Sequence, residues 1–197
     1  MSCADEFTLE QFHLFKSTNV KNLDRHNNTC NEADHVLSGF QLKKRKMGVS
    51  TRLKFKRRCC QVLAAAHSGK WTKAASARTY HPNKGKSLHY LDRQGWIGCA
   101  RNFLMSGFHM RTQRSELWFD LVCLSLKQGF RTECKTFSTN YRGDRDFSVQ
   151  RLIKHKVNCA GGGNGVYPFI RQWKLQTYDS GNQGYLRILY TCCKIVG

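Results

Sequence analysis

The sequence has few acidic residues and no long apolar run. The first feature limits the partners that the protein can bind, and the second argues against a membrane-spanning protein. It has 13 Asp and Glu against 33 Lys and Arg, which leaves a net charge of +20. This excess predicts a polyanionic partner: a nucleic acid, a sulfated glycan or an anionic membrane surface. No apolar run approaches the roughly 20 residues of a membrane span, so no transmembrane segment is expected. No signal-peptide-like apolar segment follows Met1, which fits either a trimmed, exported chain or a cytosolic protein with reduced thiols.

The sequence also lacks the short motifs that metal sites and common active sites need. There is no CxxC or HxxxH spacing for zinc. The eight histidines are scattered, and no Ser-His-Asp, Cys-His or paired-carboxylate pattern stands in a supporting motif. The run Gly161-Gly162-Gly163 lacks the Lys-Ser/Thr and the helix that follow a phosphate-binding loop. We therefore expect no catalytic residue, no metal and no cofactor, and hence a protein that is not an enzyme.

What the chain has is one pattern used three times, at intervals of roughly 60–70 residues. Each copy opens with a short motif that leads to a cysteine and ends in an alternating segment with one or two further cysteines. The three openings are Leu23-Asp24-Arg25 to Cys30, Leu91-Asp92-Arg93 to Cys99 and Val149-Gln150-Arg151 to Cys159. A fixed repeat predicts one structural unit packed three times around a shared core. We expect a single domain of three repeats, at about 1–62, 63–126 and 127–197.

The last segment of each repeat alternates, which indicates a half-buried antiparallel strand. The residues on one face are Leu53, Phe55, Arg57 and Cys59, then Leu117, Phe119, Leu121 and Cys123, then Leu186, Ile188, Tyr190 and Cys192. The Ser-Gly-Phe segments fit a second strand, in which Gly39 and Gly107 allow a bulge or a close backbone approach. Polar loops are expected at Lys43–Ser50, Thr112–Ser115 and Tyr178–Gly184, and a helical turn or two at Val62–His67. These units predict an all-β fold, either a disulfide-stapled β-prism of three antiparallel repeats or a β-trefoil.

The ten cysteines follow the repeats, and their distribution predicts how they pair. A Cys-Cys doublet occurs only in the two repeats that carry an extra upstream cysteine, and the middle repeat has Leu124 in place of the second doublet cysteine. Gain or loss in pairs is what disulfide bonding produces in an oxidising compartment. The middle repeat allows one bond, and its equivalents give the rest: Cys99–Cys123, Cys30–Cys59, Cys159–Cys192, Cys3–Cys60 and Cys134–Cys193. Paired cysteines favour an exported protein.

Residues 43–58 carry nine basic side chains and no acidic one, and they are the main candidate binding residues. Arg57 falls on the inward face of its strand. The other eight are the candidate polyanion-binding set: Lys43, Lys44, Arg45, Lys46, Arg52, Lys54, Lys56 and Arg58. Counterion release lets such a patch bind sulfate or phosphate groups without reading a sequence. The alternative is a solvated hairpin whose charge prevents an edge strand from pairing with another chain.

Two further candidate sites accompany the repeat openings. Asp24, Arg25, Asp92, Arg93 and Arg151 are candidates to line equivalent pockets, where each Arg would hydrogen-bond a sugar or a carboxylate. We favour the other interpretation, in which they form a structural salt bridge or stabilise a turn at the start of each strand. Asn27-Asn28-Thr29 is a glycosylation sequon with Asn27 as the acceptor, which agrees with export.

These motifs resemble the dermatopontin family of secreted matrix proteins and invertebrate agglutinins. The resemblance rests on Leu91-Asp92-Arg93-Gln94-Gly95-Trp96 running to Cys99, on Gly39-Phe40-Gln41 and on the strand that ends in Cys59-Cys60. A similar threefold pattern occurs in vitelline outer-layer β-prism proteins and in C-terminal domains of some protozoan perforins. The chain departs from dermatopontins in its basic charge and in lacking their Asp-Arg-x-Trp motif; Thr51-Arg52-Leu53, Glu116-Leu117-Trp118 and Tyr185-Leu186-Arg187 stand near that place.

The resemblance implies an extracellular, non-enzymatic role in binding glycans or matrix components, or in self-assembly. With the basic run, it predicts a secreted or surface adhesion, matrix or lectin-like module for anionic glycans. An intracellular basic protein that binds nucleic acid and keeps its cysteines reduced is the main alternative. The membrane-binding domain of a pore-forming toxin is a further one.

Overall fold

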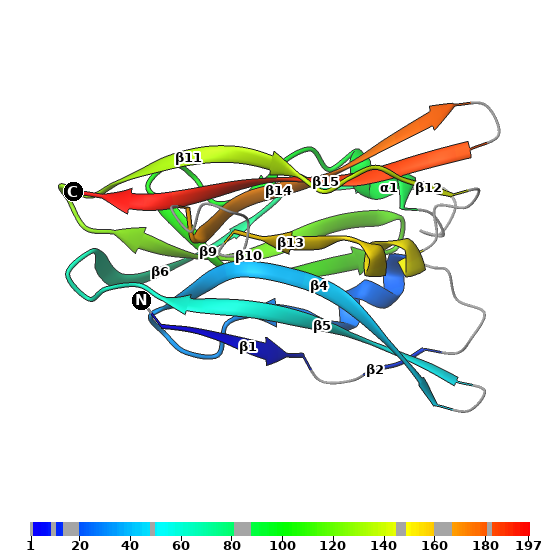
Figure 1. Cartoon of the computed structure of the whole chain (residues 1–197), viewed down its shortest axis with the longest axis horizontal. Helices are drawn as coiled ribbons and strands as arrows, with labels where there is room; N and C mark the ends of the chain where they lie inside the picture. Colours follow the sequence, from blue (N-terminus) through cyan, green and yellow to red (C-terminus); the bar gives the residue numbers. More distant parts are fainter. Residues whose placement is uncertain are drawn as a thin grey trace.

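The computed structural model describes residues 2–8, 11–13, 20–47, 50–80, 88–144, 149–159, 167–180 and 183–197. In this part of the chain the strands form three antiparallel sheets of five strands each, which we call sheets A, B and C. Figure 1 shows the long strands running side by side along the molecule, with both termini toward the same end. The expectation of an all-β fold is therefore confirmed.

In each sheet four strands pair in order across the sheet, and a fifth, short strand pairs with one of the two central strands. Sheet A has the order β1 (Cys3–Phe7), β5 (Ser50–Gln61), β4 (His35–Met47) and β13 (Lys156–Asn158), with β2 (Gln11–His13) also paired to β5. Sheet B has the order β3 (Asn27–Thr29), β9 (Phe103–Gln113), β10 (Glu116–Leu126) and β6 (His67–Ala75), with β7 (Thr79–Tyr80) also paired to β10. Sheet C has the order β11 (Arg131–Ser138), β15 (Gln183–Val196), β14 (Phe169–Ser180) and β8 (Ile97–Gly98), with β12 (Arg142–Asp144) also paired to β15. Short helical segments precede three of the short strands: η1 (Val20–Arg25), α1 (His89–Asp92) and η2 (Val149–Lys154).

Each repeat contributes one short strand to the sheet of the next repeat, and the third repeat contributes its short strand to the first. The short strand β3 of the first repeat completes sheet B, and β8 of the second completes sheet C. Strand β13 of the third repeat returns to complete sheet A beside β4 (Figure 1). Each sheet therefore contains residues from two repeats. Sheet A contains residues from both ends of the chain, so it is complete only when the last repeat has docked on the first.

One aromatic ring from each sheet meets at the centre of the core. The ring centroids of Phe40, Phe108 and Trp173 lie 5.1, 5.4 and 5.1 Å apart, in mostly edge-to-face arrangements. All three side chains are buried, and they belong to one apolar cluster that draws residues from all three sheets. The shared core predicted from the repeats is therefore present.

A bulge precedes each of these rings, and a glycine allows the incoming short strand to approach there. The register of β4 on β5 shifts between Leu37 and Gly39, and a Cβ on Gly39 would lie 2.7 Å from the carbonyl oxygen of Val157 in β13. In sheet C the roles are reversed, because Gln172 holds this position and Gly98 of the incoming strand supplies the space. The predicted close approach at Gly39 is confirmed.

The structure contains five disulfides, and their pairs are those that the repeat equivalence predicts. Three of them join different sheets, because each links a cysteine just after an exchanged strand to a long strand of the same repeat: Cys30–Cys59, Cys99–Cys123 and Cys159–Cys192. The other two join neighbouring strands within a sheet, Cys3–Cys60 in sheet A and Cys134–Cys193 in sheet C. In sheet B, Trp71 of β6 and Leu124 of β10 stand opposite each other at the corresponding place. An apolar pair thus replaces the disulfide there.

Several local expectations were wrong. Lys43–Ser50 is not a polar loop, because β4 continues to Met47 and β5 begins at Ser50. Tyr178–Gly184 is likewise mostly strand, because β14 continues to Ser180 and β15 begins at Gln183. Val62–His67 forms no helix; a turn closed by Ala66 N donating to the Leu63 carbonyl leads directly into β6. In the third repeat the residue equivalent to Leu23 and Leu91 is Leu152 rather than Val149, because each of the three carbonyls accepts a hydrogen bond from the amide three residues later.

Candidate functional site

The outer side of sheet A is lined with cations. On β4 and β5 the side chains of Phe40, Leu42 and Phe55 are buried in the core, and alternate residues therefore point to the other side of the sheet. The cationic side chains there define what we call the basic face: Lys43, Lys54, Lys56, Arg58 and Lys156. They come from three strands, β4, β5 and β13.

The strand register arranges these cations in rows across the sheet. Lys156 stands opposite Gln41, which stands opposite Lys56, and in the next row Lys43 stands directly opposite Lys54. Neighbouring strands are about 4.8 Å apart, so the cations lie close together. Like charges directly opposite each other destabilise a sheet, and an anion between them removes that penalty. The face is therefore suited to a ligand with several negative charges.

Lys156 is a residue that the sequence analysis missed. It lies in the last repeat and reaches the basic face only because β13 completes sheet A. Nothing in the run at 43–58 indicates it. To find Lys156 from the sequence, one would need to predict that β13 pairs with β4 and in which register.

The predicted polyanion-binding set is therefore changed in part. Lys43, Lys54, Lys56 and Arg58 share the basic face, but Lys44 stands opposite the core residue Leu53 and so points to the other side of β4. The backbones of Arg45, Lys46 and Arg52 lie in the paired ends of β4 and β5, where Arg45 stands opposite Arg52 and Lys46 opposite Thr51. The side chains of Arg45, Lys46 and Arg52 lie outside the described residues.

Arg57 points inward, as predicted, and joins two sheets. Its side chain is only 5% exposed. Nε donates to Glu6 at 2.8 Å, Nη2 donates to Asn31 Oδ1 at 2.7 Å, and Nη1 donates to the Asn27 carbonyl at 3.2 Å. A buried guanidinium with these partners is a structural contact between β1 and the region of β3, so Arg57 does not take part in the basic face.

The edge strand β1 adds one acidic and one aromatic residue to the basic face. Asp5 forms an ion pair with Lys56 at 2.6 Å, and both side chains are partly exposed. Phe7 is 50% exposed, and the Lys54 ammonium lies 4.4 Å from its ring centroid. A surface ion pair of this kind contributes at most about 1 kcal/mol, so Lys56 remains available to a stronger anion.

The predicted pockets at the repeat openings are contacts between repeats. Asp24 Oδ2 accepts a hydrogen bond from Thr112 Oγ1 at 2.7 Å, and Asp92 Oδ2 accepts one from Thr177 Oγ1 at 2.7 Å. Thr112 and Thr177 lie in β9 and β14, each in the next repeat. The structure therefore gives these carboxylates the structural role that was favoured from the sequence.

The arginines of these candidate pockets do not form an equivalent set. Arg25 and Arg93 each follow the Asp of their repeat, but Arg151 precedes Leu152 and so falls at a different place in its repeat. The sequence analysis aligned the third repeat on its arginine, and the buried leucines correct that alignment.

A buried polar pair recurs in each repeat and was not predicted. Thr8 Oγ1 lies 3.4 Å from His26 Nδ1, and Thr139 Oγ1 lies 2.8 Å from His155 Nδ1. In the middle repeat Ser76 Oγ donates to Gln94 Oε1 at 3.0 Å. Each hydroxyl also accepts a hydrogen bond from a backbone amide of the repeat's long strand. The pairs recur at equivalent places in the three repeats, which gives the buried His26 and His155 a structural role.

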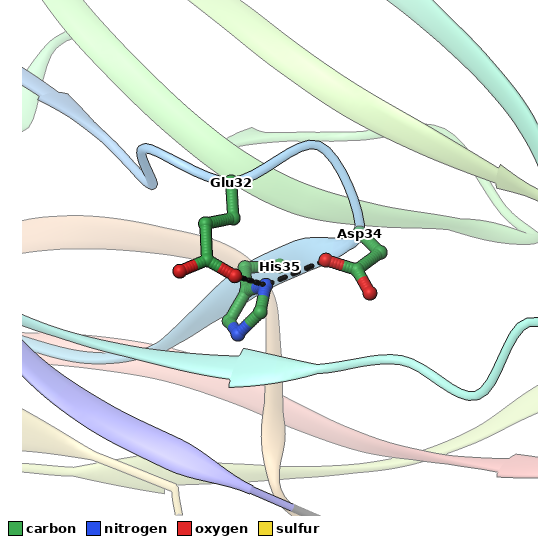
Figure 2. Close-up of side chains that lie close together, drawn as sticks. All are labelled: Glu32, Asp34 and His35. Carbon is green, nitrogen blue, oxygen red and sulfur yellow. Dashed lines mark hydrogen bonds and ion pairs between the residues drawn. The ribbon is translucent and has the colours of Figure 1, made fainter.

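Among the described residues, one group of three side chains has metal-ligand types close together. Figure 2 shows Glu32 and Asp34 pointing toward His35 at the start of β4. His35 Nδ1 lies 2.7 Å from Asp34 Oδ1 and 3.3 Å from Glu32 Oε2, and Asp34 Oδ2 accepts from Gln61 Nε2 at 2.7 Å. Both carboxylates contact the same imidazole nitrogen. These contacts fit a hydrogen-bonded turn that fastens the start of β4 to the end of β5.

The Asp34 turn predicts a specific pH dependence. The Gln61 amide, together with His35, holds the pKa of Asp34 below its ordinary value of 3.8. A lowered folded-state pKa stabilises the protein above the unfolded value, and this contribution is lost as pH falls through the folded pKa. We expect Asp34→Asn to lower the urea midpoint at pH 7, and the difference from the wild type to shrink as the pH falls below the ordinary pKa of 3.8. Glu32→Gln, at a side chain that is 70% exposed, is the control with the smaller effect. A pH-independent difference for Asp34→Asn would contradict this account.

The candidate glycosylation site lies on sheet B. Asn27 is exposed in β3, and its Oδ1 accepts a hydrogen bond from Thr29 Oγ1 at 2.7 Å. Its carbonyl is held by Arg57, so the backbone there is fixed while the amide side chain faces solvent. Glycosylation of Asn27 remains a prediction.

Comparisons with known proteins do not assign the chain to a family. Neither the known family models nor the curated proteins include a match to it. Within the described residues, no helix is long and apolar enough to cross a membrane. The function is therefore argued from the geometry of the basic face.

Proposed function

We propose that the protein is a secreted or surface-located, non-enzymatic module that binds anionic glycans through the basic face of sheet A. The observation that carries this proposal is the convergence of Lys43, Lys54, Lys56, Arg58 and Lys156 on one side of a single sheet. We also propose that the three sheets form a β-prism around the pseudo-threefold axis, as in the families that the motifs resemble. An adhesion or matrix role follows from the resemblance to those secreted families.

The disulfides support the export part of the proposal. No free cysteine occurs among the ten, and five disulfides are typical of proteins that fold in an oxidising compartment. A reduced intracellular nucleic-acid-binding protein has no reason to keep its cysteines paired by repeat. Sulfated glycans are the polyanions that such an exported protein meets outside the cell.

The proposal is tested on an immobilised heparin column with a salt gradient. The triple variant Lys43→Gln, Lys54→Gln, Lys156→Gln removes three cations from the basic face. The control Lys70→Gln, Arg101→Gln, Lys135→Gln removes three exposed cations from other parts of the surface. Because counterion release scales with the number of contacts made, we expect the first variant to elute at clearly lower salt than the control.

Two outcomes would contradict the proposal. Elution of the wild-type protein near physiological salt would mean that no specific polyanion surface exists. Equal shifts for the two triple variants would mean that net charge alone, and not the basic face, is responsible. Circular dichroism of both variants establishes that each one keeps the β-sheet structure.

A further inference from the structure

The basic face contains a hollow over Gly39. In the row that crosses sheet A at this point, Asn158 of β13 stands opposite Gly39, and Gly39 stands opposite Arg58 of β5. Because Gly39 has no side chain, a cavity of about 50 Å³ opens between its neighbours, and these include Gln41, Lys56 and Lys156. On this measure one water molecule needs about 10–15 Å³, so the hollow has room for a small group of a few heavy atoms.

The hollow is electropositive, and one of its cations has an unsatisfied hydrogen-bond donor. Lys56, Arg58 and Lys156 line it with three positive charges, against one negative charge on Asp5, which is paired to Lys56. Arg58 Nε is buried and has no hydrogen-bond partner among the described residues. Burying a charged donor without an acceptor is costly, so a small shift of the Arg58 side chain toward an anion in the hollow is favoured.

Asn158 of β13 also lines the hollow, beside Lys156. Its Oδ1 is buried without a partner in the described part of the chain, so this amide, like Arg58 Nε, is not satisfied by those residues alone. An anion in the hollow therefore meets cationic side chains from both β5 and β13.

The other two sheets show that the fold does not need these cations. At the equivalent positions of sheet B, Val122 stands opposite Gly107, and Asp120 stands opposite His109. In sheet C, Thr191 stands opposite Gln172, whose own side chain occupies the equivalent place. The same scaffold is thus built with neutral or acidic residues, so the three cations of sheet A are a specialised feature.

We propose that the Gly39 hollow is a subsite for one sulfate or phosphate monoester group of a polyanionic ligand, held by Arg58 and Lys156. This inference rests on the proposed function of the basic face and adds a defined binding position for one anionic group of the ligand. Because Lys156 and Asn158 arrive with β13, the subsite forms only when the last repeat closes on the first.

The test compares single-charge variants of the basic face by calorimetric titration with a size-defined heparin oligosaccharide and, separately, with inorganic polyphosphate. Arg58→Val and Lys156→Asn install the residues that sheet B carries at these positions, so we expect both variants to fold. Lys43→Gln removes one charge from the same face outside the hollow. We expect Arg58→Val to weaken binding about tenfold or more, as for a lost charge-assisted hydrogen bond, and Lys43→Gln about two- to threefold.

The outcomes separate the subsite from the face as a whole. A larger loss for Arg58→Val and Lys156→Asn than for Lys43→Gln supports the subsite, and the tighter of the two probes identifies sulfate or phosphate as its group. Equal losses for all three variants, with tight wild-type binding, overturn the subsite and leave the proposed function standing. Absence of wild-type binding to both probes overturns both.

Discussion

Replacing Phe108 with alanine is expected to lower the free energy of unfolding by about 3–5 kcal/mol, the usual range for a buried Phe→Ala change. Phe108 is 4% exposed and contacts the rings of both Phe40 and Trp173. Its removal leaves a cavity where all three sheets meet, and the cost is the lost burial of the ring together with the contacts that its neighbours lose. Chemical denaturation of the disulfide-intact protein measures this loss.

Leu63→Ala is the matched control for the core variant. Leu63 is 71% exposed in the turn between β5 and β6, so its truncation is expected to change stability by less than about 0.5 kcal/mol. A loss below about 1 kcal/mol for Phe108→Ala would show that the three rings are not the centre of a shared core. That result would favour sheets that are stable separately.

The repeat pattern made the strands and the cysteine pairing predictable from the sequence. A period of two identified the inward face of β5, β10 and β15, and even the inward position of Arg57, because successive residues of a strand point to opposite sides. The missing second cysteine at Leu124 was sufficient to separate the two kinds of disulfide. In the structure Trp71 stands opposite Leu124, which gives the physical reason for that absence.

The strand exchange was not predictable from the same pattern. The exchanged strands are two or three residues long, too short for any periodicity, and their partners lie in other repeats. For this reason Lys156 was missed, and the third repeat was aligned on Arg151 instead of Leu152. The first part of the basic run, Lys43–Ser50, was also taken for a loop, because like charges repel between neighbouring strands and give no sign of the β4–β5 pairing that holds Lys43 opposite Lys54.

Removing the Cys99–Cys123 disulfide is expected to cost about 3–4 kcal/mol of stability in the double variant Cys99→Ala, Cys123→Ala. This disulfide closes a loop of 24 residues in sequence and links the end of β8 in sheet C to β10 in sheet B. It is also the sole disulfide of the middle repeat, since Trp71 and Leu124 replace the second one. Denaturation measures the loss, and amide hydrogen exchange locates it.

The location of the effect distinguishes this disulfide from one within a sheet. Strand β8 has only two residues, and the Cys99 amide that follows it donates to the Arg171 carbonyl at 3.0 Å, so without the covalent link this junction between repeats should open first. We expect faster exchange at Cys99 and in β8 for the double variant. The control Cys3→Ala, Cys60→Ala removes a bond between the paired strands β1 and β5 and should speed exchange in β1 alone. Unchanged exchange in β8, with a stability loss below about 1 kcal/mol, would mean that the pairing of β8 with β14 holds the second and third repeats together without the Cys99–Cys123 disulfide.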